Sequence, residues 1–400
     1  MRGKKILLII PEMSMGGAQR SISKLSIELA MHHTVWLVIF NKVGGIAYAH
    51  SGELINLDVV PGGGIFNKIK SFIQRIDRLR KLKRDLDIDV SISFLEGADY
   101  INILSKVRDR IILSIRGSKQ HDETIRGKFS LLRNKVLIPW LYRKADLIVT
   151  VNQGIANELR TLYGLGKSNI ITIGNFYNTE EIKALAREPR NDNLTRLYSN
   201  PMLIVTGRLA IEKGLKQLLQ IFHQLKIKHE NLRIVFIGNG PELSDLVSSA
   251  NQLNLRVHVG SDFPESSDVI FLGNQSNVFT ILKGATVFLM NSSSEGFPNG
   301  MVEAMICGVP VVSSDCPYGP REILAPEFPY KSSITEPYFS HYGVLMPMIK
   351  TTNDARIWVE MLHDLLGKKE LLSQLAKNGL QRVDQFKKEL IVEMWFKALE

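Results

Sequence analysis

The apolar residues of the chain fall into short runs that alternate with amphipathic segments. Strand-length apolar runs occur in the first half at 5–10, 34–40, 88–94, 111–115 and 146–151. Helical segments, such as one expected at 18–31, separate most of these runs. This alternation predicts a doubly wound α/β domain, in which helices cover both faces of a mainly parallel sheet.

The second half of the chain shows the same alternation after a charged, proline-containing stretch that has the composition of a linker. The predicted boundaries are 1–185 for a first α/β domain, 186–200 for the linker and 201–380 for a second α/β domain. A last helical segment is expected at 381–400.

One stretch of the second half, 287–313, is predicted as strand, loop, helix and strand. The strands are expected at 287–290 and 309–313, and the helix at 299–307. Ligands bind outside the carboxyl ends of the strands in such sheets, and the loop 291–300 lies at that end. The loop also leads into a helix N-terminus, where free N–H groups and the helix dipole favour a phosphate.

Glycines and carboxylates occur together in this loop. Gly296 and Gly300 allow the backbone to approach a ligand closely. Glu295 precedes the helix, and Glu303 lies about one turn inside it. A carboxylate repels a phosphate but accepts hydrogen bonds from sugar hydroxyls, so the loop suits a ligand that contains both groups. The alternative is a surface glutamate followed by one that the helix dipole favours.

The segment SEGFPNGMVEAMICGVPVV, which contains Glu295 and Glu303, closely resembles the E-x7-E signature of glycosyltransferase family 4. The resemblance covers nearly the whole chain. It implies the GT-B fold, with two Rossmann-like domains facing a central cleft, and a retaining reaction. It also implies that Glu295 contacts the donor sugar near its anomeric centre and that Glu303 holds the donor ribose hydroxyls. The implied pyrophosphate-binding residues between them are Gly296, Phe297, Pro298, Asn299, Gly300, Met301 and Val302.

Two cations lie near the start of the second predicted domain. Arg208 follows a strand in the sequence GRL-x3-KG, and Lys213 with Gly214 is expected to begin the next helix. Arginine offers a diphosphate a bidentate fork and lysine offers a point charge. The motif resembles the diphosphate-binding pair of the family, so Arg208, Lys213 and Glu295 are the candidate catalytic residues. Two ordinary surface cations are the alternative.

Three further donor-binding elements rest on the resemblance. The Gly16-Gly17 pair after the first strand resembles a loop that lies near the donor phosphates and the acceptor, although such a pair is also common in ordinary turns. Gly238 and Asn239 form a tight turn after a strand, and the third glycine of a dinucleotide-binding fingerprint is missing there. Leu272 ends the strand that packs on the donor base.

On the acceptor side, the segment 114–118 resembles a loop in which many family members have a histidine. This chain has Arg116 there, and the nearest histidine, His121, is displaced. Arg116 is therefore the acceptor-side candidate, and no histidine is assigned a role. Neither a metal nor another cofactor is expected, because Arg208, Lys213 and the helix start at 299–302 can neutralise the leaving diphosphate.

The net charge of +10 indicates anionic partners, namely nucleic acid, anionic lipid or phosphorylated substrates. No aromatic-rich basic strand motif and no zinc framework is present, which argues against nucleic acid. The apolar runs are shorter than a membrane-spanning helix or a signal peptide requires. Two cysteines without a metal-ligand pattern fit a reduced, cytoplasmic protein.

Two basic segments, 68–84 and 126–144, lie in the first predicted domain. In the first, apolar residues recur at helical spacing at Ile69, Phe72, Ile73, Ile76, Leu79 and Leu82. Each segment taken alone predicts an apolar stripe that faces the core and a solvated basic face. Together they also fit an interfacial surface for anionic lipid, which predicts a peripheral protein on the inner face of the cell membrane.

The predicted activity is that of a retaining hexosyltransferase. It would move a hexose or N-acetylhexosamine from a nucleotide diphosphate sugar, expected to be a UDP-sugar, to a glycan acceptor. The segment DCPYGPREIL at 315–324 resembles the corresponding segment of bacterial enzymes that extend polyprenyl-diphosphate glycans for surface polysaccharides. The alternatives are a GDP-mannose-dependent, lipopolysaccharide-core or teichoic-acid transferase, a basic nucleic-acid-binding protein, and a nucleotide-binding pseudoenzyme. By resemblance to the fold, Trp395 and Phe396 imply a last helix that packs back on the first domain.

Overall fold

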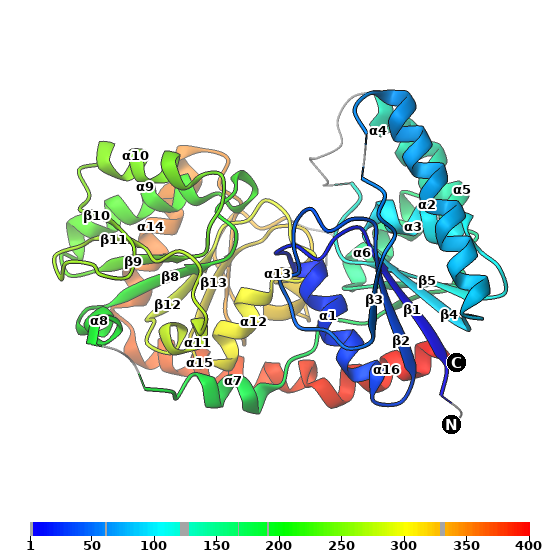
Figure 1. Ribbon diagram of the computed structural model, residues 1–400. Helices are drawn as coiled ribbons and strands as arrows, with labels where there is room; N and C mark the ends of the chain where they lie inside the picture. The colour runs from blue at the N-terminus through cyan, green and yellow to red at the C-terminus, as the bar shows by residue number, and fades with distance from the viewer. Residues whose placement is uncertain (1–2, 61, 121–127, 167, 190–191, 329–332) are drawn as a thin grey trace. The chain divides into compact units, whose positions relative to one another are not determined.

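The chain folds into two α/β units, which Figure 1 shows. The computed structural model describes residues 3–60, 62–120, 128–166, 168–189, 192–328 and 333–400. The first unit comprises Met1–Asn175 with Glu389–Glu400, and the second comprises Phe176–Lys388. Each unit is built around its own sheet and is described by itself. Within the described ranges, none of the helices combines the length and the apolar character needed to cross a membrane.

The first unit has a seven-stranded parallel sheet in the order β3-β2-β1-β4-β5-β6-β7. Its strands are β1 (Lys5–Ile10), β2 (Thr34–Ile39), β3 (Glu53–Asn56), β4 (Val90–Phe94), β5 (Arg110–Ile115), β6 (Leu147–Thr150) and β7 (Ile170–Thr172). Ile6 on the central strand lies opposite Val35 of β2 and Val90 of β4. The strand order reverses between β1 and β4, which makes their carboxyl ends the ligand-binding position of such a sheet.

Helices cover both faces of this sheet, with α2, α3 and α5 on one side and α1 on the other (Figure 1). The helices are α1 (Gly17–Ala30), α2 (Ile65–Asp85), α3 (Glu96–Leu104), α4 (Lys128–Leu132), a π-helical turn (Arg133–Leu137), α5 (Ile138–Tyr142), α6 (Gln153–Thr161) and α16 (Lys388–Leu399). Nearly all of α16 belongs to this unit, where Phe396 packs edge-on against His32 with a centroid distance of 5.3 Å.

The second unit has an eight-stranded sheet in the order β10-β11-β9-β8-β12-β13-β15-β14, with only β14 antiparallel to its neighbour among the described strands. Its strands are β8 (Met202–Thr206), β9 (Arg233–Ile237), β10 (Val257–Val259), β11 (Val269–Phe271), β12 (Val287–Met290), β13 (Val311–Ser314), β14 (Tyr338–Phe339) and β15 (Val344–Met346). The order reverses between β8 and β12, so the ligand-binding position here lies at their carboxyl ends.

Two apolar cores, one on each face of the second sheet, hold its helices. One core includes residues of α9 (Leu215–Lys228), α10 (Leu243–Gln252) and α14 (Thr352–Leu366). The other includes residues of α7 (Thr179–Leu185), α11 (Val278–Leu282), α12 (Asn299–Ile306) and α13 (Gly319–Leu324). The remaining helical elements are α8 (Asp192–Arg196), α15 (Lys369–Val383) and the 3-10 turns Leu197–Ser199, Ile211–Lys213 and Asp384–Phe386.

The prediction of two doubly wound α/β sheets is confirmed. The division between the units lies at Asn175, ten residues before the predicted boundary at 185, because Tyr177, Ile182 and Ala186 pack in the core of the second unit. Leu197, within the predicted linker, is buried in the same core, while residues 190–191 of that linker lie outside the described ranges. The predicted strand at 309–313 begins at Val311 instead, since Pro310 has no N–H to donate to a sheet.

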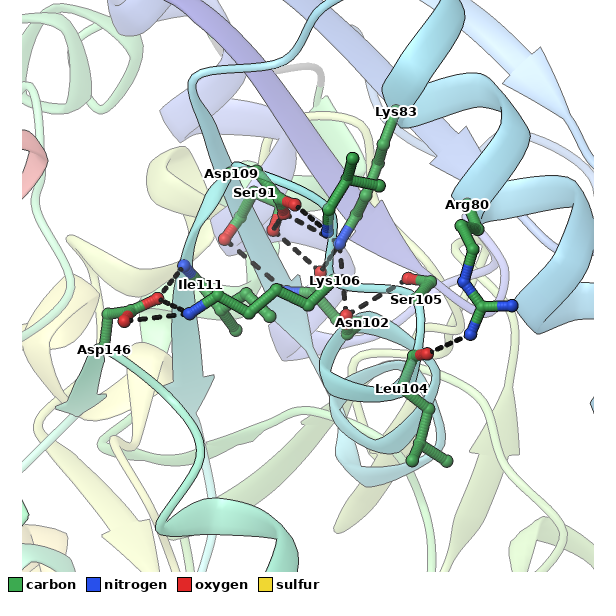
Figure 2. Close-up of polar contacts among 11 residues, drawn as sticks. Arg80, Lys83, Ser91, Asn102, Leu104, Ser105, Lys106, Asp109, Ile111 and Asp146 are labelled. Carbon is green, nitrogen blue, oxygen red and sulfur yellow. Dashed lines mark hydrogen bonds and ion pairs between the residues drawn. The ribbon is translucent and has the colours of Figure 1, made fainter.

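The predicted basic faces of the first unit are partly wrong, because two of the cations counted in them are buried. Lys83 of α2 forms an ion pair with Asp109, with Nζ 2.8 Å from Oδ2, and also donates to the Oδ1 of Asn102 (Figure 2). Arg133 pairs with Glu96 through Nη2 at 2.5 Å. Interior charges persist when they are paired and hydrogen-bonded, which sequence spacing alone does not reveal.

Candidate functional site

The second unit has a shallow pocket at the point where its strand order reverses. The end of β8 and the residues after it line one side, including Arg208 and Lys213. The end of β12 and the residues after it, through Ser292, line the other side. Two predicted cations therefore meet at the ligand-binding position of the sheet. Their charges favour an anionic ligand, and the fork of arginine suits a phosphate.

Close contact between two loops fixes the chain around Arg208. Gly207 donates its N–H to the Ile237 carbonyl at 2.9 Å, and Leu209 donates to the Asn239 carbonyl at 3.0 Å. A Cβ atom on Gly238 would lie 2.0 Å from the Gly207 oxygen. Gly238 also has a φ of 129°, which side chains rarely adopt. Gly238 is thus required for the two loops to approach, and the exposed Asn239 supports the Arg208 loop through its backbone.

Lys213 and Glu295 form an ion pair, with Nζ 2.5 Å from Oε1. Ser292 also donates to this oxygen at 2.7 Å. Burial acts to lower the pKa of Lys213, but the Glu295 carboxylate and its hydrogen bond outweigh burial, so the pKa lies above its usual value. Lys213 is therefore a cation held toward the pocket, and the pair joins the loop after β8 to the loop after β12.

The predicted helix start at Lys213 is displaced by two residues. Lys213 ends the 3-10 turn, Gly214 takes a left-handed conformation with φ 59°, and α9 begins at Leu215. The Gly214 carbonyl accepts a hydrogen bond from the Asn291 amide at 3.0 Å. A side chain at Gly214 would collide with Asn291, so a residue other than glycine could not adopt this conformation without displacing the loop after β12.

The backbone of Glu295 is held on both sides. Its N–H donates to the Pro317 carbonyl at 2.7 Å, and its carbonyl accepts from the N–H groups of Tyr318 and Gly319. Gly296 follows at once, and a Cβ on Gly319 would lie 2.7 Å from the Gly296 oxygen. The loop that carries Glu295 is therefore clamped against the segment between β13 and α13, which keeps its carboxylate beside Lys213.

The start of α12 packs closely on the end of β8. Pro298 caps the helix, and a Cβ on Gly300 would lie 2.3 Å from the Thr206 hydroxyl. Phe297 stacks on Tyr177, whose hydroxyl is 2.5 Å from the Asn299 side-chain oxygen. The Met301 and Val302 side chains are fully buried in the core. The N–H groups of both residues donate to the Pro298 carbonyl, at 3.1 and 3.4 Å, so the predicted contact of Met301 and Val302 with a phosphate is not open in this structure.

Glu303 and Leu272 are both buried in the second unit. Glu303 lies inside α12, and burial together with its carboxylate raises the pKa of Cys307 to about 12. Leu272 follows β11, and its N–H donates to the Phe236 carbonyl at 2.9 Å. Neither residue belongs to the lining of the pocket, and a carboxylate such as that of Glu303 suits hydroxyl groups as hydrogen-bond donors.

The remaining predicted site residues belong to the first unit. Gly16 and Gly17 lie at the start of α1, after the central strand β1. Gly16 has an extended backbone, and its N–H is 3.3 Å from the Tyr48 hydroxyl. Arg116 follows β5 and donates to the Asn175 side-chain oxygen, which also accepts from Ser21 of α1 at 3.2 Å. His121 lies outside the described residues.

Sequence reasoning missed several residues that hold these loops. Glu158 of α6 accepts hydrogen bonds from the N–H groups of Lys119 at 2.7 Å and Gln120 at 3.1 Å, which fixes the chain after Arg116. Nothing in the sequence near Glu158 signals this, because the partners are far apart along the chain. Ser292 could have been found as a small polar residue two positions after the end of a buried strand.

Comparison with known proteins gives family matches over both units. The description "Glycosyltransferase Family 4" matches residues 15–181, and the description "Glycosyl transferases group 1" matches residues 194–341. An uncharacterised glycosyltransferase of Methanocaldococcus jannaschii is 28% identical over 358 residues, or 84% of each chain. The N-acetylgalactosamine-N,N'-diacetylbacillosaminyl-diphospho-undecaprenol 4-alpha-N-acetylgalactosaminyltransferase of Campylobacter jejuni is 23% identical over 80% of this chain and 83% of its own.

Solved structures match the whole chain. Sucrose-phosphate synthase from Thermosynechococcus elongatus has a TM-score of 0.75 at 16% identity, with 99% of this chain and 98% of that chain covered. The Anabaena protein HepE in complex with UDP has a TM-score of 0.71 at 14% identity, with 99% of each chain covered. At these identities the similarity shows the fold, which is GT-B.

Proposed function

The chain belongs to glycosyltransferase family 4, and we propose that it transfers a hexose or N-acetylhexosamine from a UDP-sugar, with retention of configuration at the anomeric carbon. The observation that carries this proposal is the pocket at the carboxyl ends of β8 and β12, where Arg208 and Lys213 meet and Lys213 contacts Glu295. Two cations at such a position suit a sugar nucleotide, whose diphosphate leaves with additional negative charge.

In this proposal different residues around the pocket bind different parts of the donor. Arg208 and Lys213 hold the diphosphate, and the loop that leads into α12 faces the same group. Glu295 contacts the transferred sugar, and Glu303 accepts hydrogen bonds from the ribose hydroxyls. Because the leaving diphosphate gains charge as its bond to the sugar breaks, the fixed cations stabilise the transition state more than the ground state. The reaction then needs no metal ion.

The proposed acceptor is a glycan carried on polyprenyl diphosphate, used in bacterial surface polysaccharide or glycan assembly. The support is the similarity to the Campylobacter jejuni enzyme, whose name gives a diphospho-undecaprenol substrate. The acceptor would bind the first unit, at the carboxyl ends of β1 and β5, where Gly16, Gly17 and Arg116 lie. Peripheral attachment to the inner face of the membrane would bring the enzyme to such an acceptor.

The donor proposal is tested by thermal unfolding in the presence of UDP, UDP-sugars and GDP-mannose, each with and without EDTA. The correct donor should raise the unfolding midpoint, because a ligand at a hundred times its Kd stabilises the folded state by about 2.7 kcal/mol. EDTA should leave this shift unchanged, and Arg208→Ala should abolish it. A shift with GDP-mannose alone would contradict the UDP-sugar proposal, and a shift lost in EDTA would contradict metal-free binding.

Replacing Glu303 and replacing Glu295 should have different effects on the steady-state kinetic constants. Glu303→Ala is expected to raise the donor KM roughly tenfold or more, since the hydroxyls it binds keep their charge during the reaction. Glu295→Ala is expected to lower kcat roughly a hundredfold, because it removes a charge beside the reacting sugar. The isosteric variants Glu303→Gln and Glu295→Gln control for loss of packing. A main effect of Glu303→Ala on kcat, together with a main effect of Glu295→Ala on KM, would contradict these roles.

A further inference from the structure

The first half of α2 presents an unusual row of apolar side chains to solvent. Ile65, Ile69 and Ile73 are exposed and recur every four residues, so they lie along one face of the helix. Phe66 beside them is 85% exposed. Of the six apolar residues at helical spacing in this segment, four pack in the core as a core-facing stripe requires, namely Phe72, Ile76, Leu79 and Leu82. Ile69 and Ile73 face solvent instead, as the alternative of an interfacial surface requires.

Unequal helix lengths explain the exposure. The neighbouring α3 has nine residues and α2 has 21, so α3 can cover only part of α2. The contacts between them lie in the second half of α2, where Arg80 donates to the Leu104 carbonyl and Lys83 to Asn102. The first half of α2 rests instead on residues 59–60, to which Ser71 and Arg75 donate. Among the described residues of this unit, these contacts leave the outer face of the first half of α2 exposed to solvent.

A second apolar row lies on the segment from α4 to α5. Leu132, Val136 and Trp140 are exposed and also recur every four residues, and Leu131 is exposed beside them. The inner side of this segment is anchored by Arg133, which pairs with Glu96 at the start of α3. Both rows thus flank α3. We call them together the apolar surface, which consists of Ile65, Phe66, Ile69, Ile73, Leu131, Leu132, Val136 and Trp140.

Exposed cations surround this surface. Lys68 and Lys70 lie between the apolar residues of α2, and Lys135 lies beside Val136. The Lys144 ammonium is 3.7 Å from the centre of the Trp140 ring. Residues 65–76 and 128–144 contain no aspartate or glutamate. Apolar side chains, a half-exposed tryptophan and lysines on the two segments that contact α3 match the anionic interface of a bilayer. A second copy of the chain would instead bring like charges together.

We propose that the apolar surface docks on an anionic lipid bilayer, with its apolar side chains among the acyl chains and its lysines at the lipid phosphates. The proposal rests on the proposed function in one respect, which is the position of the acceptor. The C-terminus of α2 leads into β4, and α3 and α4 follow the carboxyl ends of β4 and β5. The first half of α2 and α4 therefore lie toward the carboxyl edge of the sheet, where a lipid-linked acceptor would reach Gly16 and Arg116.

The fluorescence of Trp140 can report on this docking. The other tryptophans are Trp36, which is half-buried, and Trp358 and Trp395, which are buried, whereas Trp140 is 54% exposed. Vesicles of phosphatidylcholine with one quarter phosphatidylglycerol, brominated on their acyl chains, should quench the Trp140 fluorescence of the full-length protein at low salt. Trp140→Phe should lose this quenching. Absence of quenching in the wild-type protein would overturn the proposal.

Sedimentation with the same vesicles, without any nucleotide sugar, measures affinity. Phe66→Ser with Ile69→Ser should weaken binding about tenfold or more, because burial of two large apolar side chains is lost. Lys68→Glu with Lys70→Glu should also weaken it about tenfold or more, and high salt should release the wild-type protein. Ile227→Ser is the matched control, since Ile227 is 78% exposed between two lysines on α9 of the second unit.

Three further outcomes would overturn the proposal. The first is equal binding of the Phe66→Ser/Ile69→Ser variant and the wild-type protein, and the second is equal binding to vesicles without phosphatidylglycerol. The third is a wild-type dimer in solution that Phe66→Ser/Ile69→Ser dissociates, because the surface would then bind a second copy. Since vesicle binding needs no donor, a protein that binds vesicles but transfers no sugar would disprove the proposed function and leave this proposal intact.

Discussion

Replacing either pocket cation, Arg208 or Lys213, by alanine is expected to lower kcat by roughly a hundredfold or more, the effect of losing one transition-state charge contact. Both side chains line the pocket at the carboxyl ends of β8 and β12. In the proposed reaction the leaving diphosphate gains charge as the sugar departs, so a lost cation costs more in the transition state than in the bound donor complex. The loss should therefore appear mainly in kcat, and the change in KM should be smaller.

Lys216→Ala is the matched control for these variants. Lys216 lies on the first turn of α9, pairs with Asp245 at 3.1 Å, and does not line the pocket. Its loss should leave kcat near the wild-type value. Because Lys213→Ala also removes the partner of Glu295, the melting temperature of each variant must be measured beside its kinetics. If Arg208→Ala and Lys213→Ala both transfer sugar as fast as Lys216→Ala and the wild-type protein, the donor site is placed wrongly.

Lys83→Met is expected to destabilise the first unit by roughly 3 to 5 kcal/mol, the usual cost of leaving a buried charge without its partner. The Lys83 and Asp109 side chains are almost fully buried. Burial lowers the pKa of Lys83 to about 8, and burial also acts to raise the pKa of Asp109, although the lysine keeps it below its usual value. Both groups are thus charged at neutral pH, and removing Lys83 leaves the Asp109 carboxylate buried beside Ser91 (Figure 2).

Urea unfolding followed by tryptophan fluorescence measures this effect, since Trp36, Trp140 and Trp395 all belong to the first unit. The neighbouring Arg84 is exposed, and Arg84→Met should change the stability by only about 0.5 kcal/mol or less. Lys83→Met combined with Asp109→Asn should be more stable than Lys83→Met alone, because the amide restores neutrality and still accepts from Ser91. A Lys83→Met protein as stable as wild type would contradict the assignment of this pair to the core.

The central strands could be predicted from sequence because their apolar runs stand out from their surroundings. β1 at Lys5–Ile10 and β12 at Val287–Met290 match the predicted ranges, since each strand is buried on both faces and reads as a continuous apolar run. β3 and β7 were not predicted. They are edge strands of four and three residues with half-buried side chains, and so carry little apolar signal.

Among the candidate site residues, the sequence singled out those that lie in short local patterns. The strand, glycine-rich loop and helix around Glu295, and the cations after β8, follow from short patterns that place polar groups at strand ends. The ion pair between Lys213 and Glu295 joins residues that are 82 positions apart. No local pattern encodes such a contact, since it depends on β8 and β12 being neighbours in the sheet.

The sequence by itself determined the type of each sheet, the family and the candidate donor residues, because these depend on apolar periodicity and on short motifs. Only the tertiary structure decided which charges and apolar side chains are buried. Lys83 and Arg133 look like surface cations in the sequence but are paired inside the first unit, and Ile69 and Ile73 look like core residues but face solvent. The physical reason is that burial depends on neighbours distant in sequence, here an α3 too short to cover α2.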